Sequence, residues 1–207
     1  MSYIVQGSGE WLAQRRGKLT ASRVADAFAK LKSGGWSKSR FDLMRELVAE
    51  RMTDASIDRF VSPEMRWGID QEPNAKAEVE EVTSKILVPA TFVEHPSIED
   101  FGATPDAYLG RDAVVEIKCP QPTTHLQYIL NGTVPEEYRP QIIAQLACTK
   151  RTGALFVSYD PRVNGPKRLF MREWEPDPAE IAAMESMARE FLEELEALFQ
   201  RVTMEAA

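Results

Sequence analysis

The sequence has few of the residues on which several classes of protein depend. Its 207 residues include 2 cysteines and 2 histidines, so we expect neither a disulfide framework nor a metal site built on clustered thiolates or imidazoles. No apolar run approaches the roughly 18–20 residues that a membrane span needs, and the start of the chain lacks the basic-then-apolar pattern of a secretory signal. A G-x(4)-G-K-[ST] phosphate loop is also missing, which argues against an ATP-driven motor. These absences predict a cytoplasmic protein with no membrane span.

A surplus of basic residues is missing as well. Lysine and arginine total 25 against 32 aspartate and glutamate residues, which gives a net charge of −7. Proteins that coat nucleic acid are normally basic, so any DNA binding here requires local basic features or bound cations. The hydrophobic fraction of 43% is sufficient for a real core, and no linker or repeat interrupts the chain. We therefore predict one folded domain over residues 1–207.

The spacing of apolar residues changes along the chain, and this change predicts an α/β fold. A helix capped within 20–22 is expected to end near Leu31, and the run 86–93 is expected to form one edge or bulged strand because it contains Pro89. The other expected helices cover 41–51, 63–82, 123–130, 135–150 and the segment from 178 onward, and the other expected strands cover 108–109, 113–119, 154–159 and 168–174. Strands with helices on both sides in sequence predict a mixed central β-sheet flanked by helices.

The tract between Thr104 and Lys118 carries the residues best suited to chemistry. Asp106 precedes a predicted hairpin whose turn centres on residues 110–112, so antiparallel pairing brings Asp106 opposite residue 115 or 116. Glu116 and Lys118 are two residues apart on a strand and share a face. Two carboxylates beside an ammonium group suit a hard cation such as Mg²⁺ and the hydrolysis of a phosphodiester. The alternative is a solvated hairpin with a Glu–Lys ion pair.

Pro105-Asp106 together with Glu116-Ile117-Lys118 resembles the PD-(D/E)xK nuclease signature. The wider sequence resembles one branch of that superfamily, the phage lambda exonuclease or YqaJ-like viral recombinase family. The matching blocks, in order, are 11–22 (W-x(3)-R-x-G-x(2)-T-A-S), 67–72 (W-G-x(2)-Q-E), 116–120 (E-(L/I)-K-C-P), 138–141 (Y-R-P-Q) and 159–162 (Y-D-P-R). This resemblance implies a restriction-endonuclease-like core.

The resemblance also implies an active site. Asp106, Glu116 and the main-chain carbonyl of Ile117 would hold Mg²⁺, and Glu72 would reach a second Mg²⁺ or its water shell, with Mn²⁺ as a substitute for either ion. Lys118 would act on the attacking water and Gln141 would orient it. From the residues alone, Gln141 and Gln145 could instead cap an exposed helix face.

Contacts to a DNA end follow from the same resemblance. Arg15, Ser22 and Thr104 would form a pocket for a 5′-terminal phosphate, and Met65 would be an apolar wedge that splits the terminal base pair. By its residue type alone, Met65 would more commonly pack in the core.

One departure from the family pattern concerns the phosphate pocket. Where the family can supply a second phosphate-binding arginine, this chain has Thr123-Thr124-His125. Either Arg16 or His125 would have to compensate.

The resemblance implies a Mg²⁺-dependent 5′-to-3′ exonuclease that digests linear double-stranded DNA to mononucleotides and leaves a 3′ single strand, in phage-type homologous recombination. It also implies a homotrimeric ring around the DNA and a single-strand annealing protein as partner, in a bacterial or phage-infected cell. We expect the channel of such a ring to be lined by Lys30, Lys32, Lys38, Arg40 or Lys150-Arg151. Two alternatives remain, which are a PD-(D/E)xK endonuclease and a non-catalytic protein that binds DNA ends.

Overall fold

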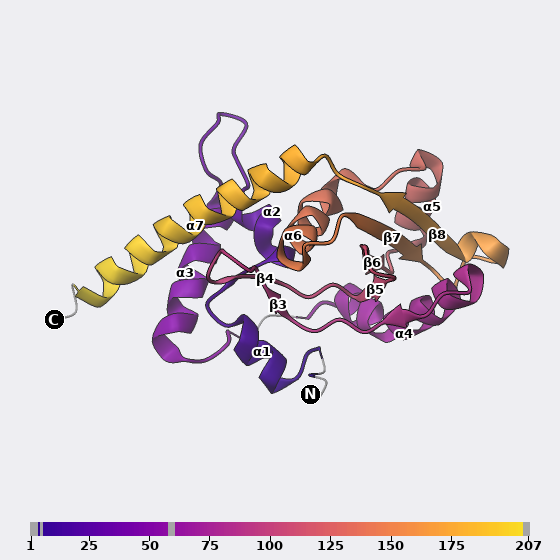
Figure 1. The fold of residues 1–207 in the computed structure, drawn as a ribbon, viewed down its shortest axis with the longest axis horizontal. Coiled ribbons are helices and arrows are strands. Elements are labelled where there is room, and N and C mark those ends of the chain that lie inside the picture. The colour runs from indigo at the N-terminus through magenta and orange to yellow at the C-terminus, as the bar shows by residue number, and fades with distance from the viewer. Residues whose placement is uncertain (1–3, 5, 58–60, 205–207) are drawn as a thin grey trace.

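The computed structural model describes residues 4, 6–57 and 61–204, and it contains two mixed sheets flanked by helices (Figure 1). The smaller sheet has the order β1-β4-β3, and the larger sheet has the order β2-β5-β6-β7-β8. The strands are β1 (Leu19–Thr20), β2 (Leu87–Val88), β3 (Val93–Glu94), β4 (Phe101–Ala103), β5 (Ala107–Leu109), β6 (Ala113–Lys118), β7 (Gly153–Tyr159) and β8 (Leu169–Trp174). The predicted α/β class with a mixed sheet is confirmed.

The β5–β6 hairpin forms as expected. Gly110 at its turn has a φ of +61°, a conformation that glycine adopts without steric cost. Ala107 pairs with Val115, and the Asp106 amide donates to the carbonyl of Val115 at 3.1 Å. The register therefore sets Asp106 across from Glu116.

Parallel pairing of β6 with β7 requires a crossover, because two parallel strands cannot be joined by a tight turn. The crossover contains α5 (Pro122–Asn131), the 3₁₀ turn Glu136–Tyr138 and α6 (Arg139–Thr149). Every residue of β7 is buried, as is typical of a central strand covered on both faces.

The two faces of the larger sheet are covered by different helices. On one face, Leu155 and Val157 pack with Ala75 and Val79 of α4 (Pro63–Thr83). On the other face, Phe156 and its neighbours pack against α6. Since side chains alternate along a strand, the residues of β6 at even positions face α6. Glu116 and Lys118 are therefore directed toward α6, and Ile117 faces α4.

The remaining helices surround the smaller sheet. They are α1 (Gly9–Arg15), α2 (Val24–Ala27), α3 (Lys38–Thr53) and α7 (Pro178–Met204). Figure 1 shows α7 running along one side of the molecule, where it packs against α3 and α6. Its buried face consists of Met184, Ala188, Phe191 and Leu195. No helix among residues 4, 6–57 and 61–204 is both long enough and apolar enough to cross a bilayer.

Two sequence predictions about the fold are wrong. The helix expected to reach Leu31 ends at Ala27, because the chain turns back at Gly34 and Gly35 and Lys30 pairs with Trp36. The run 86–93 is divided between β2 and β3, which belong to different sheets. Its two halves separate around Pro89, which lacks the N–H that a continuous ladder needs.

Candidate active site

The two sheets meet at the segment from Thr104 to Asp106. This segment leaves β4 of the smaller sheet and enters β5 of the larger one. Two extended residues span at most about 7 Å. A group that contacts Thr104 therefore lies close to a group that contacts Asp106. The junction therefore joins two neighbouring sites, the carboxylate site around Asp106 and the arginine–hydroxyl pocket around Thr104. The second site is called the phosphate pocket, after the ligand that the sequence resemblance predicts for it.

Glu116 is the centre of the carboxylate site, and its side chain is 1% exposed. Its Oε1 accepts from Nε2 of Gln141 at 2.7 Å and lies 2.6 Å from Nζ of Lys118. Its Oε2 accepts from Nε2 of Gln145 at 2.6 Å. A buried carboxylate is stable only when it is hydrogen-bonded and paired, and these three donors both satisfy Glu116 and fix its orientation.

Asp106 lies beside Glu116, and its negative charge is offset less than that of Glu116. Its Oδ2 accepts from the amide of Ile117 at 2.6 Å. Burial raises the pKa of Asp106 well above its usual range, and the charges of Glu116 and Glu72 raise it further, while Lys118 opposes them. These surroundings disfavour the charged form of Asp106, so a nearby cation would stabilise it.

Lys118 is held in its charged form. Burial alone would lower its pKa, but the nearby Glu116 and Asp106 carboxylates outweigh that effect and raise it. Nζ of Lys118 also lies 4.8 Å from the ring centroid of Tyr138, which favours a cation. With its pKa raised in this way, Lys118 is protonated and acts as a hydrogen-bond donor.

The donor set fits a hard divalent cation, because it combines carboxylate oxygens with uncompensated negative charge. Asp106 and Glu116 lie across from each other on the β5–β6 hairpin, and the amide of Ile117 donates to Asp106. Glu72 acts on Asp106 electrostatically, and its Oε1 forms an ion pair with Lys76 at 2.6 Å. Across the described residues, no three His, Cys, Asp or Glu side chains form a ready-made metal-binding group. A cation would therefore also need main-chain or water oxygens.

The phosphate pocket brings together residues that are distant in sequence. Nη1 of Arg15 donates to Oγ1 of Thr104 at 3.4 Å, and Nη2 donates to Oγ1 of Thr20 at 3.3 Å and to Oγ of Ser22 at 3.2 Å. The guanidinium also stacks 4.1 Å from the ring centroid of Trp11, whose Nε1 donates to Oγ1 of Thr104 at 3.1 Å. Arg15, Ser22 and Thr104, predicted together from the sequence, are together in the structure.

Three contributors to these sites were not predicted. Trp11 and Thr20 complete the hydroxyl and aromatic surroundings of Arg15, and both lie in the matching block 11–22. Gln145 was expected to have no role beyond an exposed helix face, yet it is fully buried against Glu116. Its position four residues after Gln141 is the signal, because that spacing presents both amides on one face of α6.

The family pattern can supply a second phosphate-binding arginine, and the two candidates to replace it here, His125 and Arg16, lie in different surroundings. His125 is fully buried, with Nδ1 2.7 Å from Oγ of Ser158 and Nε2 2.8 Å from the carbonyl of Lys167, so it cannot contact a phosphate. Arg16 lines the same 310 Å³ cavity as Arg15 and forms an ion pair with Asp54. Of the two candidates, Arg16 is the one placed near the pocket.

Burial decides the outcome for Met65, Arg40 and the two cysteines. Met65 on α4 is 54% exposed, so the expectation of a core methionine is wrong and an apolar side chain is available at the surface. Arg40 is wrong as a channel residue because it is 1% exposed, with Nη2 paired to Glu194 at 2.8 Å. Burial raises the pKa of both Cys119 and Cys148 to about 12, so neither thiol is a nucleophile.

The Y-D-P-R block has a bracing role beside the site. Asp160 is fully buried and accepts from Nε of Arg162 at 2.8 Å. Nη2 of Arg162 donates to the carbonyl of Pro120 at 3.0 Å, and its guanidinium lies 4.5 Å from the ring centroid of Trp67. Arg162 thus links three of the matching blocks and fixes the chain that leaves β6 after Lys118.

Comparison with known proteins identifies the family and the fold. The YqaJ-like viral recombinase domain matches residues 10–152. An alkaline exonuclease (LHK-Exo) from Laribacter hongkongensis is 38% identical over 96% of this chain and 98% of that chain, with a TM-score of 0.89, and its complex with dAMP gives the same values. A phage-related exonuclease from Haemophilus somnus 129PT, 11% identical over 92% of this chain and 96% of its own, shares the fold with a TM-score of 0.67. No curated protein sequence matches. On the matched domain and the 38% identity together, this chain belongs to the YqaJ-like viral recombinase family.

Proposed function

We propose that this protein is a Mg²⁺-dependent 5′-to-3′ exonuclease. It digests linear double-stranded DNA to mononucleotides and leaves a 3′ single strand for phage-type homologous recombination. The observation that carries the proposal is the junction from Thr104 to Asp106, which puts an arginine–hydroxyl pocket beside a carboxylate–lysine site. Membership of the family and the solved alkaline exonuclease support the nuclease class.

Asp106, Glu116 and the carbonyl of Ile117 would hold Mg²⁺, with Glu72 close enough to reach a second ion or its water shell. A divalent cation bound there would offset the charge of the phosphodiester and lower the pKa of a bound water. The excess negative charge at Asp106 favours such an ion, because binding relieves the repulsion from Glu116 and Glu72.

The protein side chains have distinct tasks in hydrolysis. Lys118, held protonated by the carboxylates, donates to the attacking water and stabilises negative charge as it develops on the phosphate. Gln141 and Gln145 hold both oxygens of Glu116, so that the carboxylate keeps one orientation throughout the reaction. Such preorganisation costs no rearrangement when charge appears.

The phosphate pocket would set the direction of digestion, because it would bind the 5′ end of a strand. A guanidinium binds phosphate with two parallel hydrogen bonds, and the hydroxyls of Thr20, Ser22 and Thr104 can rotate to donate to the same anion. Because the junction keeps the pocket and the carboxylate site two residues apart in the chain, a terminal phosphate at Arg15 would leave the next phosphodiester near Asp106. Cleavage there would release a 5′-mononucleotide.

Met65 would separate the terminal base pair. An exposed apolar side chain on a helix can enter between base steps and unstack them. Met65 lies on the same helix as Glu72, so the wedge and one carboxylate of the proposed metal site are carried by one helix.

A homotrimeric ring and a single-strand annealing partner complete the proposal. With Arg40 buried, the basic residues left to line a channel are Lys30, Lys32, Lys38, Lys150 and Arg151. Light scattering coupled to size exclusion would give the mass of the assembly, and a mass of one chain of 23.3 kDa would contradict the ring.

The decisive experiment uses linear duplex labelled at one 5′-phosphorylated end and a covalently closed circle, each with Mg²⁺ and then with EDTA. We expect early release of labelled mononucleotide from the linear duplex alone, and no release with EDTA. Cutting of the circle would identify an endonuclease instead. No Mg²⁺-dependent cleavage of either substrate would favour a non-catalytic protein that binds DNA ends.

A further inference from the structure

The turn at Gly17 joins the two chain segments that build one side of the phosphate pocket. Arg15 ends α1 just before this turn, and Thr20 ends β1 just after it. Gly17 has a φ of +67°, and a Cβ atom there would meet Cγ of Arg51 at 2.6 Å. The position of the Arg15 guanidinium therefore depends on how this turn is held.

Two adjacent side chains of α3 hold Gly17 by both of its main-chain polar groups. Oε2 of Glu50 accepts from the amide of Gly17 at 2.8 Å, and Oε1 of the same buried carboxylate accepts from the amide of Ile57 at 3.2 Å. Nε of Arg51 donates to the carbonyl of Gly17 at 2.9 Å. The turn is thus bound from the helix rather than only by its own chain.

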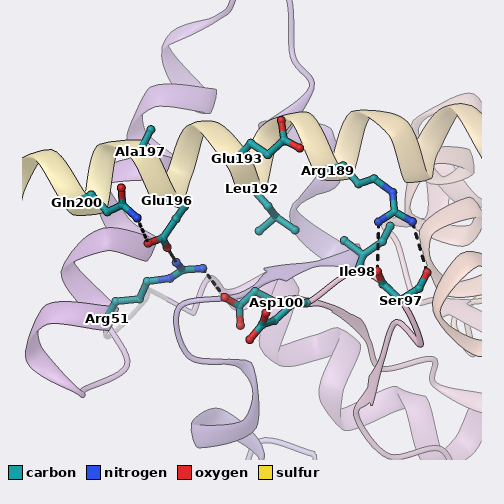
Figure 2. A pocket seen from close by; sticks show the side chains of 11 residues that line it. Arg51, Ser97, Ile98, Asp100, Arg189, Leu192, Glu193, Glu196, Ala197 and Gln200 are labelled. Atoms are coloured by element: carbon teal, nitrogen blue, oxygen red, sulfur yellow. Dashed lines mark hydrogen bonds and ion pairs between the residues drawn. The ribbon is translucent and has the colours of Figure 1, made fainter.

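Arg51 also reaches the other side of the pocket. Its Nη2 donates to Oδ2 of Asp100 at 2.8 Å, as Figure 2 shows. Asp100 has a left-handed φ of +58°, and its carbonyl accepts from the amide of Leu19 at 2.8 Å. From Asp100 the chain passes through β4 to Thr104, which is the partner of Arg15.

Arg51 therefore touches both segments whose alignment forms the pocket. One segment runs from Arg15 to Ser22, and the other runs from Asp100 to Thr104. Its third contact, from Nη1 to Glu196 of α7 at 3.1 Å, is exposed and reaches neither segment (Figure 2).

We propose that Glu50 and Arg51 are positioning residues for recognition of the 5′-phosphate. They fix the Gly17 and Asp100 turns, and in this way they set the distance between Arg15 and Thr104. The proposal rests on the proposed function of the pocket. It does not depend on cleavage, since neither residue belongs to the carboxylate site.

The test compares the affinity for duplex ends that carry a 5′-phosphate with the affinity for 5′-hydroxyl ends, by fluorescence anisotropy in EDTA. The variant Arg51→Lys keeps the charge but cannot present the planar fork that reaches Gly17 and Asp100 together. We expect its preference for the phosphorylated end to fall about tenfold, the effect of losing one charge-assisted hydrogen bond. With Mg²⁺ present, KM for phosphorylated ends should rise while kcat stays near the wild-type value.

Two further variants serve as a second test and as a control for the end-preference measurement. Glu50→Gln has the same shape and replaces one acceptor by a donor, so it carries the test if Arg51→Lys does not fold. Glu196→Ala removes the contact of Arg51 to α7, together with a hydrogen bond from Gln200 on the same helix. It leaves the Gly17 and Asp100 contacts of Arg51 in place, and we expect it to keep the wild-type preference. The inference is overturned if folded Arg51→Lys and Glu50→Gln keep that preference, or if they weaken binding to both kinds of end equally.

The same data separate this inference from the proposed function. If the wild-type protein binds phosphorylated ends selectively but cleaves nothing with Mg²⁺, the exonuclease proposal fails. The positioning role is then still decided by the end preference of Arg51→Lys and Glu50→Gln. If the wild-type protein has no preference for a 5′-phosphate, the pocket does not exist as a phosphate site, and the inference fails with it.

Discussion

The carboxylate site and the phosphate pocket are neighbours with opposite chemistry. Around Asp106, desolvation and the negative charges of Glu116 and Glu72 raise the pKa of Asp106, while Lys118 opposes them. Around Arg15, a guanidinium meets hydroxyl groups and an indole ring, and a hydroxyl accepts from arginine without cancelling its charge. Under the proposed function, a cation would complete one site and an anion the other, as a metal-dependent enzyme that acts on phosphorylated DNA ends requires.

The largest expected effect comes from Lys118, the lysine that contacts Glu116 in the carboxylate site. Lys118→Met should lower the rate of mononucleotide release about 10²- to 10³-fold, the usual range for removing a donor that stabilises developing charge. Binding of phosphorylated ends should change little, because Arg15 is untouched. Single-turnover cleavage and anisotropy measure the two quantities. The exposed Lys85→Met is a matched control, and equal losses in both variants would contradict a specific role for Lys118.

Arg15 should show the complementary pattern. Arg15→Gln removes the charge that fits a phosphate, so cleavage of 5′-phosphorylated duplex should fall roughly 10- to 100-fold, as expected for one or two charge-assisted hydrogen bonds. Cleavage of 5′-hydroxyl duplex should remain near its wild-type rate. The ratio of kcat/KM for the two substrates is the measurement, and Arg45→Gln on the exposed face of α3 is the control. An equal loss on both substrates would mean that Arg15 supports the fold and not the phosphate.

The sequence predicted the carboxylate site better than the phosphate pocket, and distance along the chain explains why. The β5–β6 hairpin is local, so turn position and strand alternation were enough to set Asp106 across from Glu116. The bond from Trp11 to Thr104 spans 93 positions and depends on the parallel pairing of β1 with β4, which no local pattern encodes. Arg15, Ser22 and Thr104 were found only through the resemblance.

The errors in the fold have the same origin. The apolar run 86–93 looked like one strand because each half is β-prone. Its halves pair with β5 and with β4, and those partners are specified later in the chain. The helix expected to end near Leu31 stops at Ala27 because a glycine turn returns Lys30 to Trp36. Local propensity shows where strands and helices can form, and tertiary pairing decides where they end.

Met65 should have a smaller effect that depends on the substrate. Met65→Ala removes the apolar wedge, so blunt duplex should be digested more slowly, by roughly fivefold if about 1 kcal/mol of contact is lost. A duplex with a frayed 5′ end needs no wedge and should be digested at the wild-type rate. Comparing initial rates on the two duplexes tests this. A uniform slowing would assign Met65 to general DNA contact.

The carboxylate repulsion can be tested without any reaction. Asp106→Asn keeps an acceptor for the Ile117 amide and removes a charge that Glu116 and Glu72 disfavour. Without metal, the variant should melt about 2–4 °C higher than the wild type, the shift for roughly 1 kcal/mol in a chain of this length. Mg²⁺ should raise the Tm of the wild type and not that of the variant. Equal Mg²⁺ shifts in both proteins would place the ion elsewhere.

The smallest expected effect concerns the pH dependence of stability, which should have opposite signs for His95 near the smaller sheet and Asp106 near the larger one. His95 starts the β3–β4 turn that leads to Thr104, and its Nδ1 accepts from the amides of Ser97 and Ile98. Burial lowers the pKa of His95 below its ordinary value of 6.5, and the charge of Lys150 lowers it further, although Glu185 opposes both.

A group with a lowered pKa contributes stability above its unfolded pKa and loses that contribution as the pH falls through its folded pKa. The His95 region should therefore lose stability below about pH 6.5. Asp106 has a raised pKa, so it should gain stability as the pH falls. In metal-free melting curves from pH 8 to pH 5, His95→Gln should lose the acid-side decline, and Asp106→Asn should show a steeper one. If neither substitution alters the slope, the two regions do not titrate as their surroundings require, and the electrostatic contrast between them is wrong.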